Sequence, residues 1–536
     1  MTKGGPTTMV DYRKPGVFDE PEQKPNERAR NAAKRRGADN YGDGEQKPNK
    51  SLARMRAKYT QVSEGGKTII YHTGFDPETR RKLWFREPIQ TFKDRYRTAL
   101  IQKEGGQTIT MAEALLNHPH LKIAKGTCID PEDKPGALVY PDSEGQGFLN
   151  LWSGWGVEPK PGETTVLKEM IRDSLCGGHQ NQFEFLMKAL AWKIQHPSEI
   201  LDVALVFTGG KGIGKTTFGE RVMGRIFGNH FFKAVMVDQV TGRFRGHLRE
   251  TMFLFADEAF RSVTRENVGA LNALITDKEI PIEAKGKDII RAKNRVALMV
   301  GANDWTVPLT TDDRRYFIAD VSTHLAVPQD LTEAEKEKHP NAAYWRKFDV
   351  PLSTGELQGA FLHELMHMPI SDGWHPRYNI PLTRAAAEAK NQSLRGFDKY
   401  WRMCLNRGEL PVFDMRDDVG GPKEIDFDDE TEAKSRSGYR VWSEGEMRIK
   451  PTALVAEYES WLQKHNSERD RRCTIDYVLE RLEYFHGLIR ARSKQMRYWR
   501  IPKLNIAQEQ FAAKLGSPDM FSQPTEGGHP RSTNRG

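Results

Sequence analysis

A glycine-rich segment directly after an apolar run is the feature that most restricts how this chain can fold. The run DVALVF predicts a buried strand, and GGKGIGKTT follows it. Gly209, Gly214, Lys215 and Thr216 fill the pattern GxxxxGK[ST], in which glycines let backbone N–H groups turn toward phosphate oxygens. The next segment, FGERVMGRIFG, predicts a helix whose N-terminus faces the same anion. The sequence therefore predicts an α/β fold with a phosphate-binding loop.

Each side chain of this loop has an expected role. A lysine in the position of Lys215 contacts the β and γ phosphates, and a hydroxyl in the position of Thr216 binds Mg²⁺. The predicted cofactors are therefore ATP and Mg²⁺. The residues expected to surround the nucleotide are Gly209, Gly210, Lys211, Gly212, Ile213, Gly214, Lys215, Thr216 and Thr217.

Two further apolar runs end in polar side chains. TMFLFADEAF predicts a buried strand that ends at Asp257 and Glu258, and RVALMVGAND predicts another that ends at Asn303. Because ligands bind at the carboxyl ends of parallel strands, we expect Asp257 to hold Mg²⁺ and Glu258 to polarise the attacking water. Asn303 is expected to bond the γ-phosphate or that water. The alternative is a chance acidic pair and an Asn that caps a turn.

Two arginines follow shortly after Asn303, in the segment DDRRYFIADV. A guanidinium at the rim of a nucleotide site can reach into a neighbouring subunit and offset the charge that develops in phosphoryl transfer. Arg314 and Arg315 are both candidates for this role, with a slight preference for Arg314. One of the two can instead form a structural ion pair.

The four signals lie between Gly209 and Arg315 in an order that resembles superfamily 3 helicases, which are AAA+ ATPases. LNLWSGW, LAWKIQHP, TGRFRGHL, PIEAKGKD and IPLTRAAAEAKNQSL are similar to the phage and plasmid primase-associated helicase family, which is related to the C-terminal half of poxvirus-type primase-helicases. The resemblance covers roughly residues 60–410. It implies an ATP-dependent DNA helicase of phage or mobile-element replication that acts on single-stranded and forked DNA as a homohexamer or similar ring.

The resemblance also assigns a place to a basic hairpin. In the family a β-hairpin between the carboxylate strand and the Asn strand points into the ring channel. IPIEAKGKDIIRAKN occupies that position here, with Lys285 and Lys287 at or near its tip as expected DNA contacts. The alternative is an ordinary solvated hairpin. Many relatives carry a primase-polymerase domain N-terminal to this unit, whereas about sixty residues precede it here. We therefore expect a separate primase or polymerase as partner.

A second DNA-binding candidate lies near the C-terminus. Two predicted helices, TALVAEYESWLQKHN and TIDYVLERLEYF, are followed by two short strands, LIRAR and MRYWRIP. This order is similar to a winged helix-turn-helix. The wing would carry Arg490, Arg492, Lys494, Arg497 and Arg500, with Tyr498 and Trp499 between the last two. Of these, Arg492, Lys494 and Arg497 are the expected contacts to DNA phosphates. The alternative is a small packing domain with a solvated basic face.

The predicted architecture is an AAA+ core with an N-terminal helical collar and a C-terminal winged-helix-like α+β domain. Its expected parts are a disordered basic tail (1–57), an accessory domain (58–160), the collar (161–200), the ATPase core (201–325), a helical part (326–411), an acidic linker (412–449), the winged-helix-like domain (450–505) and a disordered tail (506–536). In the accessory domain, KTIIYH and RKLWFR predict a β-hairpin, and TMAEALLNH predicts a helix.

Composition narrows the class of protein. A net charge of +8 and a pI near 9.0 fit a polyanionic partner. Four dispersed cysteines without a CxxC pair argue against a disulfide framework and a thiolate zinc site. No apolar run reaches about 18 residues and no signal sequence is evident, so we expect no membrane contact and a bacterial host cytoplasm.

Two other functions remain open from the sequence. An ATP-dependent initiator or loader would melt an origin without processive unwinding and would share every motif above. A zinc peptidase is suggested by HELMH, which places His363 and His367 on one helix face with Glu388 at the spacing of a third ligand. The HExxH pattern is short and arises by chance, so the sequence favours the helicase.

Overall fold

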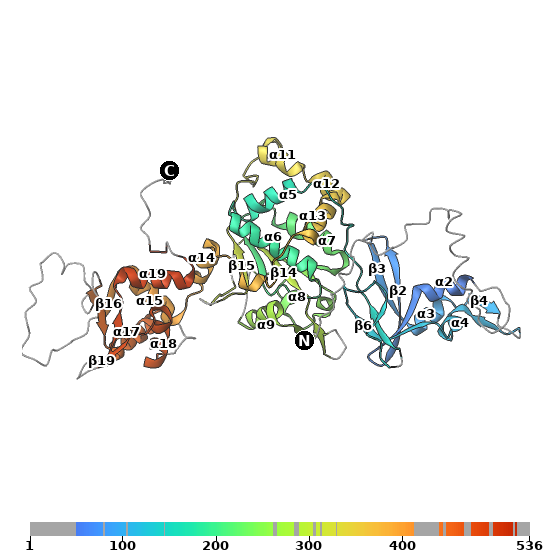
Figure 1. The fold of residues 1–536 in the computed structure, drawn as a ribbon, viewed down its shortest axis with the longest axis horizontal. Coiled ribbons are helices and arrows are strands. Elements are labelled where there is room, and N and C mark those ends of the chain that lie inside the picture. Colours follow the sequence, from blue (N-terminus) through green and yellow to red (C-terminus); the bar gives the residue numbers. More distant parts are fainter. Residues whose placement is uncertain are drawn as a thin grey trace, which may run out of the picture. The chain divides into compact units, whose positions relative to one another are not determined.

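The computed structural model describes residues 50–78, 81–102, 106–143, 145–260, 265–283, 289–303, 307–310, 313–328, 330–411, 439–442, 446–465, 473–492, 497–517 and 520–521 of the 536-residue chain (Figure 1). The chain divides into two compact units. The first comprises residues 1–304 and 321–379, and the second comprises residues 305–320 and 380–536. Within the described ranges, no helix is long and apolar enough to cross a membrane.

The first unit begins with a mixed sheet of strand order β3-β2-β1-β6-β8-β7. The turn between its first two strands is Gly65-Gly66, whose φ angles of 56° and 71° suit glycine in a tight hairpin. The predicted hairpin is confirmed, because β2 and β3 pair antiparallel and end with Asp76 opposite Arg81. The strands are β1 (Tyr59–Glu64), β2 (Lys67–Asp76), β3 (Arg81–Pro88), β6 (Lys122–Cys128), β7 (Leu138–Val139) and β8 (Gly147–Asn150).

Three short helices pack beside this sheet and share a small apolar core. This core contains Leu52 of α2, Phe92 of α3 and three residues of α4, among them Leu115, together with Tyr59 and Ile70 of the strands. The predicted helix TMAEALLNH is confirmed as α4, which begins at a reciprocal cap between Thr110 and Glu113. The elements are α2 (Lys50–Lys58), α3 (Ile89–Arg95), α4 (Met111–Leu116) and the hairpin strands β4 (Leu100–Gln102) and β5 (Thr108–Thr110).

The predicted helical region before the glycine loop is also confirmed. α5 (Thr165–Glu169) continues directly as a π-helical turn over Met170–Leu175. α6 (Gln180–Gln195) ends before Pro197, which cannot donate a backbone hydrogen bond to a continuing helix. Gln195 donates to the carbonyls of Leu365 and Met368, and so joins the end of α6 to the end of α13 (Glu356–His367).

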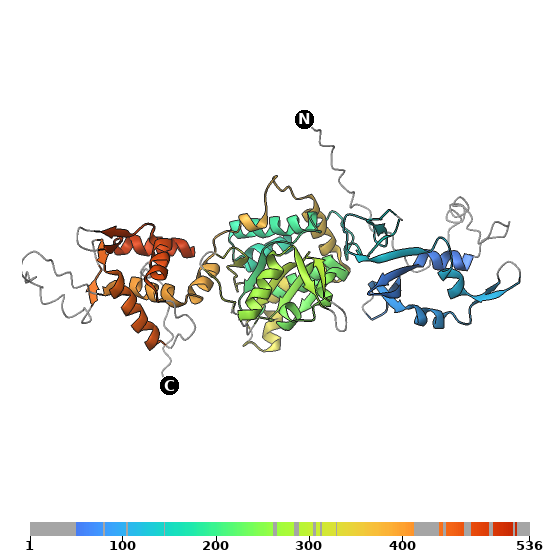
Figure 2. The same ribbon diagram turned by 90° about the horizontal axis from the view of Figure 1, so that it is seen from below.

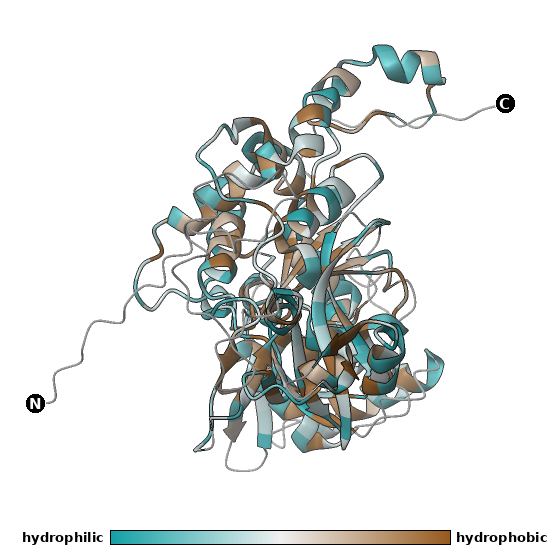
Figure 3. Ribbon diagram, turned by 90° about the vertical axis from the view of Figure 1, so that its right-hand side faces the viewer, coloured by the Kyte–Doolittle hydropathy of each residue, from teal (hydrophilic) through white to brown (hydrophobic). Residues whose placement is uncertain are grey.

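Parallel strands form the centre of the first unit, as predicted. They run in the order β10-β11-β14-β9 and pair in parallel register. All residues of β14 are buried, as expected for a parallel strand covered on both faces. Figure 3 shows hydrophobic and hydrophilic residues interleaved along the ribbons of helices and strands. The strands are β9 (Ala204–Thr208), β10 (Phe231–Ala234), β11 (Phe253–Asp257) and β14 (Ala297–Ala302).

The remaining elements of the first unit connect these strands or follow them. A π-helical turn (Thr217–Met223) follows the glycine loop, and an antiparallel hairpin of β12 (Glu279–Ile282) and β13 (Ile290–Lys293) lies between β11 and β14. The helices are α7 (Gly224–Phe227), α8 (Asp238–Thr241), α9 (Arg265–Thr276), α10 (Glu333–Lys338), α11 (Pro340–Arg346) and α12 (Asp349–Thr354), with 3₁₀ turns at Gly228–His230, Gly246–Arg249 and Pro376–Tyr378.

The second unit has a core of aromatic side chains. Phe397, Tyr400, Trp401, Trp442 and Tyr458 are fully buried and contact one another. A three-stranded antiparallel sheet of order β18-β20-β19 packs with the helices. The elements are β15 (Tyr316–Ala319), α14 (Arg384–Gln392), α15 (Gly396–Arg407), β16 (Glu409–Pro411), β17 (Tyr439–Val441), β18 (Met447–Ile449), α17 (Pro451–Lys464), α18 (Ile475–His486), β19 (Arg490–Arg492), β20 (Arg497–Ile501) and α19 (Leu504–Leu515).

The structure draws several boundaries differently from the sequence analysis. The range 50–57, assigned to a disordered tail, is helical in α2, because Leu52 is buried in the core with Phe92. The start of the predicted C-terminal tail is helical in α19, whose Phe511 and Leu515 lie in the core of the second unit. The range assigned to the acidic linker contains two strands, β17 and β18. Each of them pairs antiparallel with another strand.

The predicted helical part, 326–411, is divided between the two units at residue 380. Residues 305–320, predicted to belong to the ATPase core, are grouped with the second unit. There the hydroxyl of Thr383 donates to the carbonyl of Ile318, and Asp320 accepts from the backbone of Arg384 and Ala385. These bonds attach β15 to the start of α14.

A buried histidine makes the second unit sensitive to acid. The indole of Trp401 donates to Nε2 of His486 at 2.8 Å, and Nδ1 of His486 lies 2.9 Å from Oε1 of Gln510, which requires a neutral ring with its proton on Nδ1. Burial lowers the pKa of His486 from 6.5 to about 4. The unfolded chain therefore binds this proton at a higher pH than the folded chain does, and stability falls as the pH drops from 6.5 toward 4.

We expect this histidine to remove about 2 kcal/mol from the free energy of unfolding between pH 7 and pH 5. Urea unfolding followed by tryptophan fluorescence measures the loss in the wild type and in His486→Gln. The variant should be less stable at pH 7 and should show a smaller further loss at pH 5. An identical pH dependence in the two proteins would show that His486 does not titrate on unfolding.

Candidate functional site

The carboxyl ends of the central strands bring the predicted site segments together. β14 lies between β9 and β11, with Ala302 paired to Thr208 on one side and Gly301 paired to Asp257 on the other. The glycine loop leaves β9 at this edge, and the acidic pair leaves β11 at the same edge. Asn303, half-buried, is the first residue after β14 and therefore lies between them in the strand order.

The glycine loop follows a path that a larger residue would not adopt. Gly212 and Gly214 have φ angles of 83° and 91°, in the left-handed region that favours glycine. A Cβ on Gly214 would lie 2.8 Å from the Trp345 ring and 2.9 Å from the sulfur of Met170. The loop thus packs tightly on one side. On the other, Gly210, Lys211, Gly212 and Thr216 are exposed, whereas Ile213 is buried.

Lys215 is the buried cation of the site. Its side chain is buried, and its ammonium donates to the carbonyl of Gly209 and, at 3.0 Å, to the carbonyl of Gly210. Burial lowers the pKa of Lys215, while the negative charges of Glu258 and Asp257 oppose that shift. A Cβ on Gly301 would lie 3.5 Å from Cβ of Lys215, and Gly301 pairs with Asp257 and accepts from the backbone N–H of Glu258. The predicted lysine therefore lies beside the backbone that carries both predicted carboxylates.

A second lysine, which the sequence analysis did not single out, contacts the first carboxylate. The ammonium of Lys233 on β10 lies 3.0 Å from Oδ2 of Asp257 and 2.6 Å from Oε2 of Glu220. Both carboxylates raise the pKa of Lys233 against the opposing effect of burial. Glu220 belongs to the π-helical turn after the glycine loop, so Lys233 connects that turn to the end of β11. In the sequence, the sign of this role is a single lysine within the apolar strand segment FFKAV.

Glu258 adopts an unusual backbone conformation. Its φ angle is +54°, and its N–H donates to the carbonyl of Gly301 at 2.8 Å. A left-handed non-glycine residue costs about 1 kcal/mol or more and is concentrated at functional sites. The turn directs the chain away from β11 immediately after Asp257.

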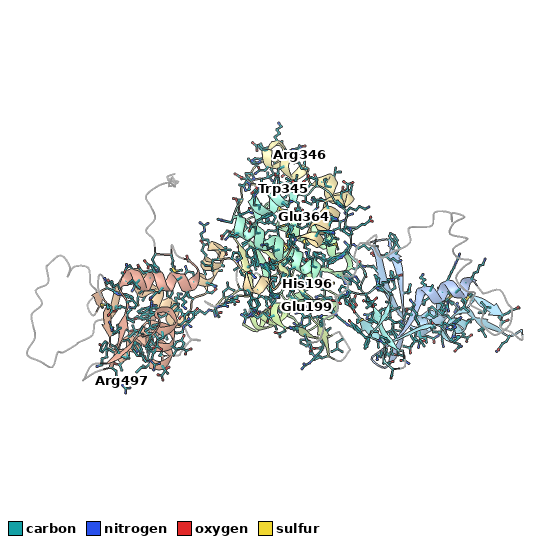
Figure 4. All side chains as sticks on the ribbon, in the orientation of Figure 1. His196, Glu199, Trp345, Arg346, Glu364 and Arg497 are labelled. Atoms are coloured by element: carbon teal, nitrogen blue, oxygen red, sulfur yellow. The ribbon has the colours of Figure 1, made fainter. Side chains whose placement is uncertain are left out.

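Distant segments hold the glycine loop in place. The hydroxyl of Ser174 donates to the carbonyl of Ile213 at 2.8 Å, and Ser322 is bonded to Ser174 through its backbone. Trp345 of α11, labelled in Figure 4, donates from its indole to the carbonyl of Leu325. The residues missed by sequence reasoning are therefore mostly supports of the loop backbone, whose roles depend on tertiary contacts that no local pattern encodes.

The residues could hold a magnesium nucleotide. The glycine loop offers an exposed backbone cradle beside Lys215, and Thr216 and Asp257 supply the hydroxyl and carboxylate oxygens that Mg²⁺ prefers. Glu258 supplies a second carboxylate at the same edge of the sheet.

The two arginines differ in their surroundings. Arg315 lies 3.3 Å from Asp313 through its guanidinium and also donates its backbone N–H to that carboxylate. Arg314 is exposed. The structural ion pair considered in the sequence analysis is thus made by Arg315, which leaves Arg314 as the residue whose side chain faces solvent.

The predicted basic hairpin is present as β12 and β13, but Lys285 and Lys287 lie outside the described residues. Its base is firmly attached. Asn294 donates to the carbonyls of Leu274 and Asp277, and the buried Lys193 of α6 donates to the carbonyl of Arg295 at 2.7 Å. Lys193 also donates to the carbonyls of Pro197 and Glu199, so its ammonium has three acceptors.

The C-terminal basic residues are only partly described. Lys494 lies outside the described residues, as does the side chain of Arg492. Arg497, labelled in Figure 4, is exposed on β20. Two neighbouring arginines have acidic partners: Arg490 pairs with Glu483 and Arg500 pairs with Glu446.

The HELMH segment is a packing helix. Glu364 accepts from the hydroxyl of Thr164 and pairs with Lys168 at 2.9 Å, so it is bonded to α5. The rings of His363 and His367 contact each other in a tilted arrangement, with centroids 4.2 Å apart. Among the described residues, no group of three or more histidines, cysteines or acidic residues could hold a metal ion. The structure therefore offers no support for the zinc peptidase reading.

Comparison with known proteins agrees with this arrangement at the level of fold. Residues 207–315 match DUF5906, a family of unknown function, and this span contains every predicted residue from Asp257 to Arg315. No curated protein matches the chain. The apo structure of the NrS-1 C-terminal region is similar over 84% of this chain and 97% of that chain, with 14% identity and a TM-score of 0.52. What the two share is a fold.

A second structure of that region, the A form in the apo state, is similar over 84% of this chain and 98% of that chain, with 13% identity and a TM-score of 0.52. The likeness therefore extends well beyond residues 207–315. It includes residues that precede the central strands in the sequence and residues that follow them.

The contact of Lys233 with Asp257 predicts how metal binding responds to mutation. Lys233→Met removes a cation that competes with a divalent ion for the carboxylates of Asp257 and Glu220. We expect Mn²⁺ binding without nucleotide to become tighter by a factor of about five, equivalent to about 1 kcal/mol for a partly exposed pair.

Electron paramagnetic resonance of free Mn²⁺ measures this affinity directly. Lys233→Arg retains the charge and should bind Mn²⁺ as the wild type does, and Lys233→Met combined with Asp257→Asn should lose the gain. Unchanged Mn²⁺ affinity in Lys233→Met would show that Lys233 does not compete for the site.

Proposed function

We propose that this protein is an ATP-dependent DNA helicase of the superfamily 3 type that acts in phage or mobile-element DNA replication. The observation that carries the proposal is the grouping of Lys215 with Asp257 and Glu258 around Gly301, at the carboxyl edge of a parallel sheet. This set contains the charges that phosphoryl transfer from ATP requires.

The residues have distinct roles in the proposed hydrolysis. The backbone of residues 209–217 binds phosphate oxygens, and Lys215 leaves its contacts with Gly209 and Gly210 to reach the β and γ phosphates. Thr216 and Asp257 hold Mg²⁺, which neutralises phosphate charge when it is bound. Glu258 orients and polarises the attacking water, and Asn303 bonds the γ-phosphate or that water.

The oligomeric part of the proposal rests on the arginines and the hairpin. Arg314 is exposed, so it is free to reach the nucleotide of a neighbouring subunit in a homohexamer or similar ring. Lys193 and Asn294 fix the base of the β12–β13 hairpin to the body of the first unit. A hairpin attached in this way can carry Lys285 and Lys287 along a single DNA strand as the site changes state.

The second unit supports a DNA-binding role of the winged-helix type. Along the chain it contains α15, β18, α17, α18, β19 and β20, and its sheet has the order β18-β20-β19. The β19–β20 hairpin is then the wing, with Arg492, Lys494 and Arg497 as the contacts to DNA phosphates.

ATP hydrolysis with and without single-stranded DNA tests the motor. The wild type should hydrolyse ATP faster with DNA. Lys215→Ala should reduce the rate at least about 100-fold, because it removes a cation that stabilises the developing charge. Glu258→Gln should reduce the rate similarly while retaining ATP binding.

Unwinding of a forked DNA separates the helicase from the origin-melting initiator or loader. Mixing inactive Arg314→Ala with inactive Lys215→Ala subunits should restore some hydrolysis if the arginine acts between subunits, whereas Arg315→Lys serves as the neighbouring control. A wild type that hydrolyses no ATP under any DNA condition contradicts the motor. Hydrolysis without unwinding favours the initiator.

A further inference from the structure

Positive charge is concentrated in one part of the chain. Residues 50–128 contain 15 lysines and arginines and seven aspartates and glutamates, an excess of eight positive charges. The net charge of the whole 536-residue chain is also +8, so the rest of the sequence is close to neutral. The basic character of this protein therefore belongs mainly to the sheet and short helices before the central strands.

Helix α2 carries a stripe of cations on its outer face. Lys50, Arg54 and Lys58 follow one another at intervals of four residues and are all exposed. Residues at this spacing lie on one side of a helix and span about 12 Å. Leu52 on the opposite side is buried in the core with Phe92, which fixes the outward direction of the stripe.

Helix α3 extends the same positive region. Lys93 on α3 and Arg97, in the turn two residues after its end, are both exposed. The hydroxyls of Tyr59 and Tyr96 lie 2.7 Å apart, and the ammonium of Lys58 lies 5.5 Å from the centre of the Tyr59 ring, so the ends of α2 and α3 are close. In Figures 1 and 2 the blue helices of this region lie together in both views.

The pKa of His72 also indicates that the ends of α2 and α3 are close, because charges from both ends act on it. Burial, together with the positive charges of Lys58 and Arg95, lowers the pKa of His72 from 6.5 to about 4. Two acidic groups lie nearby: Glu87 pairs with Arg95, and Asp94 of α3 accepts from the neutral Gln90 and keeps its negative charge. The exposed cations of this region outnumber Asp94. We call the exposed residues Lys50, Arg54, Lys58, Lys93 and Arg97 the basic face.

The chemistry of the basic face favours contacts with phosphates over contacts with bases. Its members are flexible cations, and the large exposed apolar residues of the region, Phe75, Phe85, Leu100 and Ile123, lie outside α2 and α3. Within the described residues these two helices therefore offer no exposed aromatic ring on which an unpaired base could stack. A regular array of phosphates, as on a duplex, fits such a surface without sequence readout.

We propose that the basic face binds the phosphodiester backbone of DNA, with duplex DNA as its ligand. The binding needs neither ATP nor the glycine loop. It gives the protein a hold on double-stranded DNA that is separate from the hairpin and from the second unit.

Fluorescence anisotropy of the full-length protein with a labelled duplex and a single strand of equal length, without nucleotide, tests the proposal. In Lys50→Gln/Arg54→Gln/Lys58→Gln the duplex affinity should fall about tenfold or more near 100 mM salt. The slope of log affinity against log salt should decrease by about 2 to 3, because three phosphate contacts are lost. Lys93→Gln/Arg97→Gln should lower affinity and slope in the same direction.

The matched control is Lys188→Gln/Lys338→Gln/Lys347→Gln, which removes the same charge from exposed lysines of the first unit that lie far from α2 and α3 in the sequence. Affinity and slope equal to the control in both basic-face variants would overturn the proposal. A loss confined to the single strand would overturn the assignment to duplex DNA. ATP hydrolysis without DNA should match the wild type in all variants. The DNA-binding proposal can therefore fail while the proposed ATPase stands, and the proposed ATPase can fail while the DNA-binding proposal stands.

Discussion

The position of β14 between β9 and β11 is the constraint on which the candidate site depends. Parallel pairing on both sides of β14 fixes the level at which its neighbours end, so that Thr208 and Asp257 face Ala302 and Gly301. Gly301 leaves space for this arrangement: a Cβ there would lie 3.0 Å from the Phe255 ring and 3.5 Å from Cβ of Lys215. Loop, carboxylates and Asn303 meet because hydrogen bonding between strands brings their starting points to one edge.

The loop itself is supported from two directions. Ser174, in the helical region that precedes β9, donates a hydrogen bond to the backbone of the glycine loop. Trp345 of α11, which follows the sheet in sequence, packs against Gly214 of the loop. Neither contact uses a backbone N–H group of the loop: Ser174 donates to the carbonyl of Ile213, and the Trp345 ring lies behind Gly214. A loop that must expose its N–H groups to a ligand cannot satisfy them internally, so its shape depends on contacts through its carbonyls and its rear face.

Local pattern was sufficient for the elements that carry the proposed chemistry. The glycine spacing, the apolar strands before Asp257 and Asn303, and the hairpin of β2 and β3 each have a signal within about ten residues. Lys233 was missed because one charged residue in a short apolar strand has no periodicity, and its meaning comes from Glu220 and Asp257. Helix α2 was missed because only Leu52 is buried, and a basic segment with few apolar residues is typical of a tail.

The three carbonyl acceptors of Lys193 have a mechanical consequence. An ammonium has three protons, and here three carbonyl oxygens accept from it: those of Pro197 and Glu199 in the turn after α6, and that of Arg295 after β13. Lys193 is buried, and burial lowers the pKa of its ammonium, so the three carbonyls are what stabilise the charged form. Any movement that separates these oxygens is costly, because an unpaired polar group would be left in the interior. The end of α6, the entry to β9 and the exit from β13 therefore form one stiff joint. Force applied to the hairpin passes through this joint to the helix without being absorbed by the connecting chain.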